Sequence, residues 1–197
     1  LDQENPLLMQ RMADLFRQQK KTDSALYYFR KYTGFRSETG EGQLNLLTGN
    51  FLAEMNMTDS ALFYYRKAME TDQGNAAAYL NAGIILMKTE EYQAALPYLG
   101  KAVALDPAGF SAVYNLGLVF HVLNRYDSAI YFISKAIQLM PEREDAYYQL
   151  GCTYALANQP AQAILNLRLA FEKGYKGRES LLTDPDLFGL KDNKEFQ

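Results

Sequence analysis

Small residues recur at a fixed interval along most of this 197-residue chain, and no other feature limits its fold as strongly. Four glycines lie 34 residues apart: Gly49, Gly83, Gly117 and Gly151. The alanines that follow them twelve residues later are Ala61, Ala95, Ala129 and Ala163. A second set follows after seven more: Ala68, Ala102, Ala136 and Ala170. An interval kept over four periods predicts an array of similar, stacked units.

Each unit is predicted to be a pair of antiparallel helices. Apolar or small residues at Tyr79, Ala82, Gly83 and Leu86 keep the i, i+3, i+4, i+7 spacing of one helix face. A polar break at 89–91 precedes a second apolar stripe over 92–103, which the Asp-Pro pair at 106–107 ends. The glycine of the first helix and the alanine of the second are expected to let the two helices approach closely.

One phrase occurs almost unchanged twice, as TDSALYYFRK at 22–31 and TDSALFYYRK at 58–67. Both copies are expected to begin a second helix, with Thr22 or Thr58 as the N-cap. Their spacing is 36 residues, so two extra residues are assigned to the glycine-containing connection 33–41. The repetition is therefore interpreted as architecture and not as two copies of a reactive site.

These units resemble tetratricopeptide repeats, whose unit is also 34 residues long. The large first anchor of that repeat is matched by Tyr79, Val113 and Tyr147, and its Leu-Gly pair by residues 116–117 and 150–151. The usual Trp is missing, because the chain contains none. The resemblance implies an all-α, right-handed superhelical solenoid over residues 1–177. Its five units are expected near 6–41, 42–75, 76–109, 110–143 and 144–177.

The last residues, 178–197, break the period and are expected to cap the solenoid. They resemble the short Asp-Pro-Asp segment that often follows the last repeat in bacterial proteins of this family. A solenoid needs such a cap because its last unit otherwise leaves an apolar surface open to water. The residues expected to cover that surface are Leu181, Leu182, Leu187, Phe188 and Leu190.

The resemblance also implies a binding surface, because the first helices of such units line a concave face. That face is expected to be polar at its N-terminal end, at Gln10, Asp14, Arg17, Asn50 and Glu54. The predicted partner-binding residues lie nearer the C-terminus: Leu80, Asn81, Ile84, Tyr114, Asn115, Leu118, His121, Tyr148 and Gln149. Two alternatives stay open: the apolar members could be core residues or be covered by the tail, and the amides could bond the helices to one another.

Other functional classes find little support in the sequence. The formal net charge is −3 with no basic patch, so nucleic acid is not expected as a partner. His121 and Cys152 are the only residues of their kinds and fall on one predicted face, which makes a Cys–His pair conceivable. No third group orients such a pair, and there is no phosphate-binding loop or zinc-ligand cluster. Catalysis, a cofactor and a bound metal are therefore not expected.

The sequence thus predicts a non-catalytic scaffold that holds a protein or peptide partner in its concave, apolar C-terminal groove. The alternative is a sensory or docking module that belongs to a larger bacterial signalling or envelope protein. Self-association is left open. No apolar run reaches the length of a membrane span, and the first residue is Leu1 and not Met, which favours an exported protein without excluding the cytoplasm.

Overall fold

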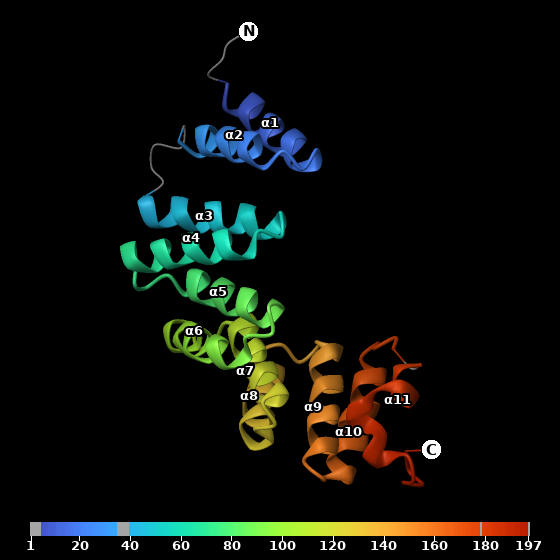
Figure 1. Ribbon diagram of the computed structural model, residues 1–197. Helices are drawn as coiled ribbons and strands as arrows, with labels where there is room; N and C mark the ends of the chain where they lie inside the picture. The colour runs from blue at the N-terminus through green and yellow to red at the C-terminus, as the bar shows by residue number, and fades with distance from the viewer. Residues whose placement is uncertain (1–4, 35–39, 178, 197) are drawn as a thin grey trace. The chain divides into compact units, whose positions relative to one another are not determined.

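The computed structural model describes residues 5–34, 40–177 and 179–196, and every regular element among them is a helix (Figure 1). The predicted all-α class is therefore confirmed for the described residues. The chain forms two compact units, Leu1–Thr89 and Glu90–Gln197. Most of the connection expected at 33–41 lies outside the described residues. None of the described helices is both long enough and apolar enough to cross a membrane.

The first unit contains five helices. They are α1 (Pro6–Gln18), α2 (Thr22–Gly34), α3 (Glu41–Glu54), α4 (Thr58–Thr71) and α5 (Ala76–Lys88). The helices α1 and α2 pack as one pair, α3 and α4 as the next, and α5 packs on α4. Asn5 caps α1 by accepting from the backbone of Leu7 and Leu8. The expected cap at Thr58 is off by one residue, since Met57 holds that position and makes no side-chain cap.

The second unit continues the pattern and adds the C-terminal elements. Its helices are α6 (Tyr92–Leu105), α7 (Phe110–Val122), α8 (Tyr126–Leu139), α9 (Glu144–Leu156), α10 (Pro160–Glu172), the short α11 (Ser180–Thr183) and the 3-10 helix η1 (Pro185–Leu190). The helices α7 and α8 form one pair and α9 and α10 another. The 3-10 helix η1 packs on α9. Residues 184–190, which comprise η1 and its N-cap, are called the DPD segment below.

The periodic glycines lie where the two helices of a pair meet. A Cβ atom on Gly117 would lie 2.7 Å from Cγ1 of Ile133 and 3.1 Å from its backbone nitrogen. A Cβ on Gly151 would lie 2.8 Å from Cγ of Leu167. These distances are shorter than van der Waals contact, so only glycine allows α7 to approach α8, and α9 to approach α10, as closely as they do.

Five turns between consecutive helices share one backbone geometry. One residue per turn has a positive φ of 57° to 62°, and the five are Lys20, Asn56, Glu90, Asn124 and Asn158. Asparagine tolerates this left-handed conformation better than other residues with a side chain. Three of the five turns therefore have a favourable residue, while Lys20 and Glu90 adopt the conformation without that help.

The tail covers part of the end of the second unit. Leu187 is fully buried and Leu190 is 2% exposed, in a cluster with Tyr148, Cys152 and Leu167. Leu181 is half-buried against the same cluster. The expectation for the other two residues was wrong, because Leu182 is 72% and Phe188 is 50% exposed.

Candidate functional site

The nine predicted partner-binding residues are divided between the two units. Leu80, Asn81 and Ile84 lie on α5 of the first unit and are half-buried. The other six lie on α7 and α9 of the second unit. Tyr114, Asn115, Leu118 and Gln149 are half-buried there, whereas His121 and Tyr148 are buried, each with 8% of its surface exposed.

The two buried members of this set contact the DPD segment. Nε2 of His121 lies 3.0 Å from Oδ2 of Asp186, and the two groups form an ion pair when the imidazole is protonated. The hydroxyl of Tyr148 donates to Oδ2 of Asp184 at 2.8 Å. Two residues that the sequence nominates for partner binding therefore bind carboxylates of the chain's own tail.

The second ring nitrogen of His121 fixes the direction of these hydrogen bonds. Nδ1 lies 3.0 Å from the hydroxyl oxygen of Thr153, and that hydroxyl donates its single proton to the carbonyl of Gln149 at 2.7 Å. Thr153 must then accept from Nδ1–H, because its proton is already used. Nε2 faces a carboxylate, which also only accepts. Each ring nitrogen of His121 therefore faces an oxygen that can accept a hydrogen bond.

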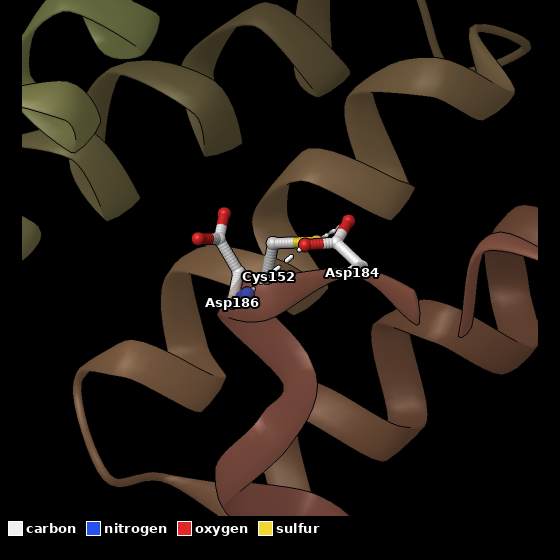
Figure 2. Close-up of side chains that lie close together, drawn as sticks. All are labelled: Cys152, Asp184 and Asp186. Atoms are coloured by element: carbon white, nitrogen blue, oxygen red, sulfur yellow. Dashed lines mark hydrogen bonds between the residues drawn. The ribbon is translucent and has the colours of Figure 1, made fainter. Parts of the chain in front are cut away.

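Cys152 lies beside the same carboxylates (Figure 2). Its side chain is 1% exposed, and the thiol donates to Oδ2 of Asp184 at 3.8 Å. Burial raises the pKa of the Cys152 thiol well above its usual range, and the negative charges of Asp184 and Asp186 raise it further. The thiol is therefore held in its protonated, weakly nucleophilic form.

Possible metal-binding atoms of Cys152, Asp184 and Asp186 lie within 4.8 Å of one another. Each of these side chains already has a hydrogen-bond partner in the protein: Tyr148 and Cys152 for Asp184, and His121 for Asp186. The group is thus accounted for as a hydrogen-bonded cluster that attaches the DPD segment. Both nitrogens of His121 are bound to other groups, so the conceivable Cys–His pair is not formed.

Tyr114 is held by packing within the second unit. Its ring stacks on Phe110 with centroids 5.3 Å apart, and its hydroxyl donates to the backbone carbonyl of Asp145 at 3.5 Å. Burial, followed by the nearby Asp145 carboxylate, raises the pKa of Tyr114 above its ordinary range. Tyr114 also packs against the cluster of Ile133 and its neighbours. The half-buried Leu118 lies one helical turn further along α7.

The amides of the predicted set form bonds inside the protein. Asn81 donates from Nδ2 to Oδ1 of Asn50 at 2.8 Å, and Tyr65 donates to the same oxygen at 3.0 Å. This network joins α3, α4 and α5, and burial raises the pKa of Tyr65 to about 12. Asn115 donates to the carbonyl of Ser111 on its own helix at 2.7 Å. These contacts favour the structural alternative for Asn81 and Asn115.

A cavity of about 300 Å³ opens in the first unit. It is lined by all five polar residues that the sequence places at the N-terminal end of the concave face, Gln10, Asp14, Arg17, Asn50 and Glu54. Phe29, Tyr32, Leu47, Phe51 and Ala13 complete the lining. Arg17 pairs with Asp14 on its own helix and with Glu54 on α3, so one cation faces two carboxylates here.

Sequence reasoning missed three residues of the second unit that contact His121, Tyr148 or Cys152: Thr153, Asp184 and Asp186. The sequence pattern predicts an apolar cap for the tail and assigns its aspartates no contact. Two aspartates spaced by one residue, at 184 and 186, are the only signal in the tail that could have suggested a polar contact. Nothing in the sequence shows that 65 residues of separation are closed by the fold.

Comparisons with known proteins identify the fold. Residues 80–146 match the family model for the tetratricopeptide repeat. A crystal structure of MamA superimposes with a TM-score of 0.72 at 26% identity, covering 85% of this chain and 97% of MamA. MamA from Desulfovibrio magneticus superimposes with a TM-score of 0.71 at 23% identity, covering 85% and 94%.

A third structure is that of YrrB, described as a TPR protein with an unusual peptide-binding site. It superimposes with a TM-score of 0.70 at 23% identity, covering 92% of this chain and 93% of YrrB. No curated protein sequence matches the chain. The repeat matched over residues 80–146 and the fold shared with these structures agree with the 34-residue period. Residues 80–146 therefore match the tetratricopeptide repeat, and the chain shares its fold with these solved structures.

Proposed function

We propose that this chain is a non-catalytic scaffold that binds a protein partner, as a peptide or a helix, against the first helices of its repeats. The observation that carries the proposal is the way in which the DPD segment binds to α7 and α9. Its contacts with α7 and α9 combine two carboxylates held by His121 and Tyr148 with buried leucines. A surface that holds one short segment through its side chains has the chemistry to hold another.

The proposed contacts are the nine residues nominated by the sequence, considered separately in each unit. On α5 they are Leu80, Asn81 and Ile84. On α7 and α9 they are Tyr114, Asn115, Leu118, His121, Tyr148 and Gln149. His121 and Tyr148 are occupied by the tail in this conformation, so the partner's first contact is placed on half-buried side chains such as Leu118 and Gln149.

The non-catalytic part of the proposal is supported by the state of the two most reactive side chains. The Cys152 thiol is buried and has a raised pKa, and the carboxylates beside it disfavour a thiolate. His121 bonds Thr153 and Asp186 through its two nitrogens, so it does not serve as a base for Cys152. Solenoids of this kind present extended surfaces for binding.

The test is capture of partner proteins by purified wild-type chain and by Leu118→Asp, compared by mass spectrometry. Leu118→Asp is preferred to Tyr114→Ala, because Tyr114 packs in the core and its loss would also lower stability. Tyr131→Asp is the matched control, since Tyr131 is 63% exposed on α8, the second helix of the same pair. We expect Leu118→Asp to lose a partner that both other proteins retain.

Equal capture by all three proteins, with unchanged circular dichroism, would remove α7 from the proposed binding surface. A protein lost with Tyr131→Asp and kept with Leu118→Asp would move the site to the second helices.

A further inference from the structure

We infer that the face formed by α7 and α9 is a receptor for an acidic peptide of the form Asp-x-Asp-Leu-x-x-Leu on a partner protein, and that the DPD segment fills this receptor within the same chain. The inference rests on the proposed function and names the chemistry of the partner. It makes the tail a competing ligand as well as a cap.

The receptor recognises carboxylates at two positions of the segment. Oδ2 of Asp186 forms a hydrogen bond with Nε2 of His121, and Oδ2 of Asp184 accepts a hydrogen bond from the hydroxyl of Tyr148. Both partners are hydrogen-bond donors, and the side chain of His121 is only 10% exposed. A charge-assisted hydrogen bond in such a partly buried place is stronger than one between neutral groups. The polar contacts therefore select an acidic residue at each position.

The receptor also recognises leucine at two positions. Leu187 is fully buried and Leu190 is 2% exposed, whereas Phe188 between them is 50% exposed. Pro185 and Gly189 are exposed as well. Contacted positions are thus separated by exposed ones along one short stretch, which is the arrangement of a linear peptide motif. The pattern of contacted residues is Asp, Asp, Leu and Leu at positions 184, 186, 187 and 190.

The receptor is complete without the segment. Its contacting residues, His121, Tyr148, Cys152 and Leu167, lie on α7, α9 and α10. The segment in turn carries part of its own geometry, because Oδ1 of Asp184 accepts from the backbone nitrogen of Asp186 at 3.0 Å and caps η1. A separate peptide with this sequence can therefore make the same contacts in the same local conformation.

The attachment of the segment to the chain determines when a partner can bind. A ligand tethered by a short linker has an effective concentration of the order of millimolar. A free peptide of equal affinity therefore competes poorly with the tail. We infer that the receptor is closed in the isolated chain and opens to a partner that binds more tightly or weakens the contacts of the tail.

The experiment measures binding of a fluorescein-labelled synthetic peptide with the sequence of residues 179–196 to the full chain by fluorescence anisotropy. The receptor is opened by Asp184→Asn/Asp186→Asn in the chain, which weakens the tail's polar contacts and leaves its leucines in place. We expect this double variant to bind the wild-type peptide at least about tenfold more tightly than the wild-type chain does.

Three controls make the result specific. Adding His121→Ala to the double variant should remove most of the gain, while adding Tyr131→Asp should leave it unchanged. A peptide carrying Asn in place of both aspartates should bind at least about tenfold more weakly than the wild-type peptide. The inference would be overturned if peptide affinity did not depend on His121 and the two carboxylates, or if the double variant bound the peptide no more tightly than the wild-type chain.

A second measurement covers the case in which the double variant fails to fold. A protease recognition sequence inserted directly after Gly177 of the otherwise wild-type chain allows the tail to be cut while it is still bound. We expect labelled peptide to exchange into the cut protein and not into the uncut one. Failure to exchange at peptide concentrations up to millimolar would overturn the inference.

These measurements use only purified chain and peptide, so they are independent of the partner-capture test of the proposed function. If Leu118→Asp loses a partner but no chain binds the peptide, the proposed scaffold function stands and the acidic peptide is rejected as its ligand. Concentration-dependent dimers of wild-type chain that disappear in the double variant would show that a second copy is the occupant, which would overturn the assignment to a separate partner.

Discussion

His121 on α7 and Asp186 in the DPD segment are 65 residues apart in sequence, yet Nε2 and Oδ2 lie 3.0 Å from each other. The contact ties the tail to the α7–α8 pair, while Tyr148 and Asp184 tie it to the α9–α10 pair. The DPD segment thus bridges two neighbouring first helices, α7 and α9. The tail is therefore a structural element of the second unit, and its contacts show which side chains this surface holds in the same chain.

The strength of this contact is the first prediction. In a double-mutant cycle of His121→Ala and Asp186→Ala, we expect a coupling free energy of about 1–2 kcal/mol, because one side chain is buried and the hydrogen bond involves a carboxylate. Urea denaturation followed by circular dichroism measures it. The control is the pair Lys173 and Glu142 at 3.4 Å, where Glu142 is 88% exposed.

The exposed control pair should show a coupling free energy below about 0.5 kcal/mol. Equal coupling in the two pairs would mean that the contact of His121 with Asp186 is no stronger than a surface ion pair.

The sequence predicted the helix pairs because their signal is local and repeated. The 34-residue spacing of Gly117 and Gly151 places each glycine against the second helix of its own pair, where the structure has it. The turn residues were not predicted individually. Their left-handed conformation recurs at every pair, but Lys20 and Glu90 lack the asparagine that would have indicated it.

The candidate site was predicted less completely, because its contacts join distant parts of the chain. The repeat period placed His121 and Tyr148 on first helices, but a period cannot say what covers them. The partner of each is an aspartate in a segment that breaks the period. Similarly, the sequence leaves open whether Asn81 bonds a ligand or a neighbouring helix, and its contact with Asn50 appears only in the structure.

The reactivity of Cys152 is the second prediction. Because burial and the carboxylates of Asp184 and Asp186 raise its pKa, the fraction of thiolate at any given pH is smaller than for an ordinary cysteine. We expect alkylation by iodoacetamide at pH 8 to be at least about 100-fold slower in the folded chain than in urea. The rate should still be rising above pH 9, near which an ordinary thiol is half ionised.

Asp184→Asn should accelerate this alkylation only a few-fold, because burial is the larger cause of the raised pKa and remains in the variant. A rate that levels off near pH 9 in the folded wild-type chain would contradict the assigned environment of Cys152.

The third prediction compares two glycines that both lie inside helices. Gly117→Ala should lower the free energy of unfolding by about 1–3 kcal/mol, because the new methyl group would overlap Ile133 and force α7 and α8 apart. Gly100→Ala on α6 should raise it by about 0.5–1 kcal/mol, since nothing lies within 4 Å of the added Cβ. Thermal and urea denaturation measure both changes, and destabilisation of similar size would show that the close approach at Gly117 has no special cost.

The fourth prediction concerns the turns between the two helices of each pair. Glu90 has φ of 62°, a conformation that Asn adopts at lower cost, so Glu90→Asn should raise the free energy of unfolding by about 0.5–1 kcal/mol. The reverse change, Asn158→Glu, at an exposed residue with φ of 57°, should lower it by a similar amount. Denaturation of the two variants beside wild type measures both. If the two substitutions shift stability in the same direction, backbone strain is not what distinguishes these turns. Opposite shifts would show that the residue at the left-handed position affects the stability of each of these two turns.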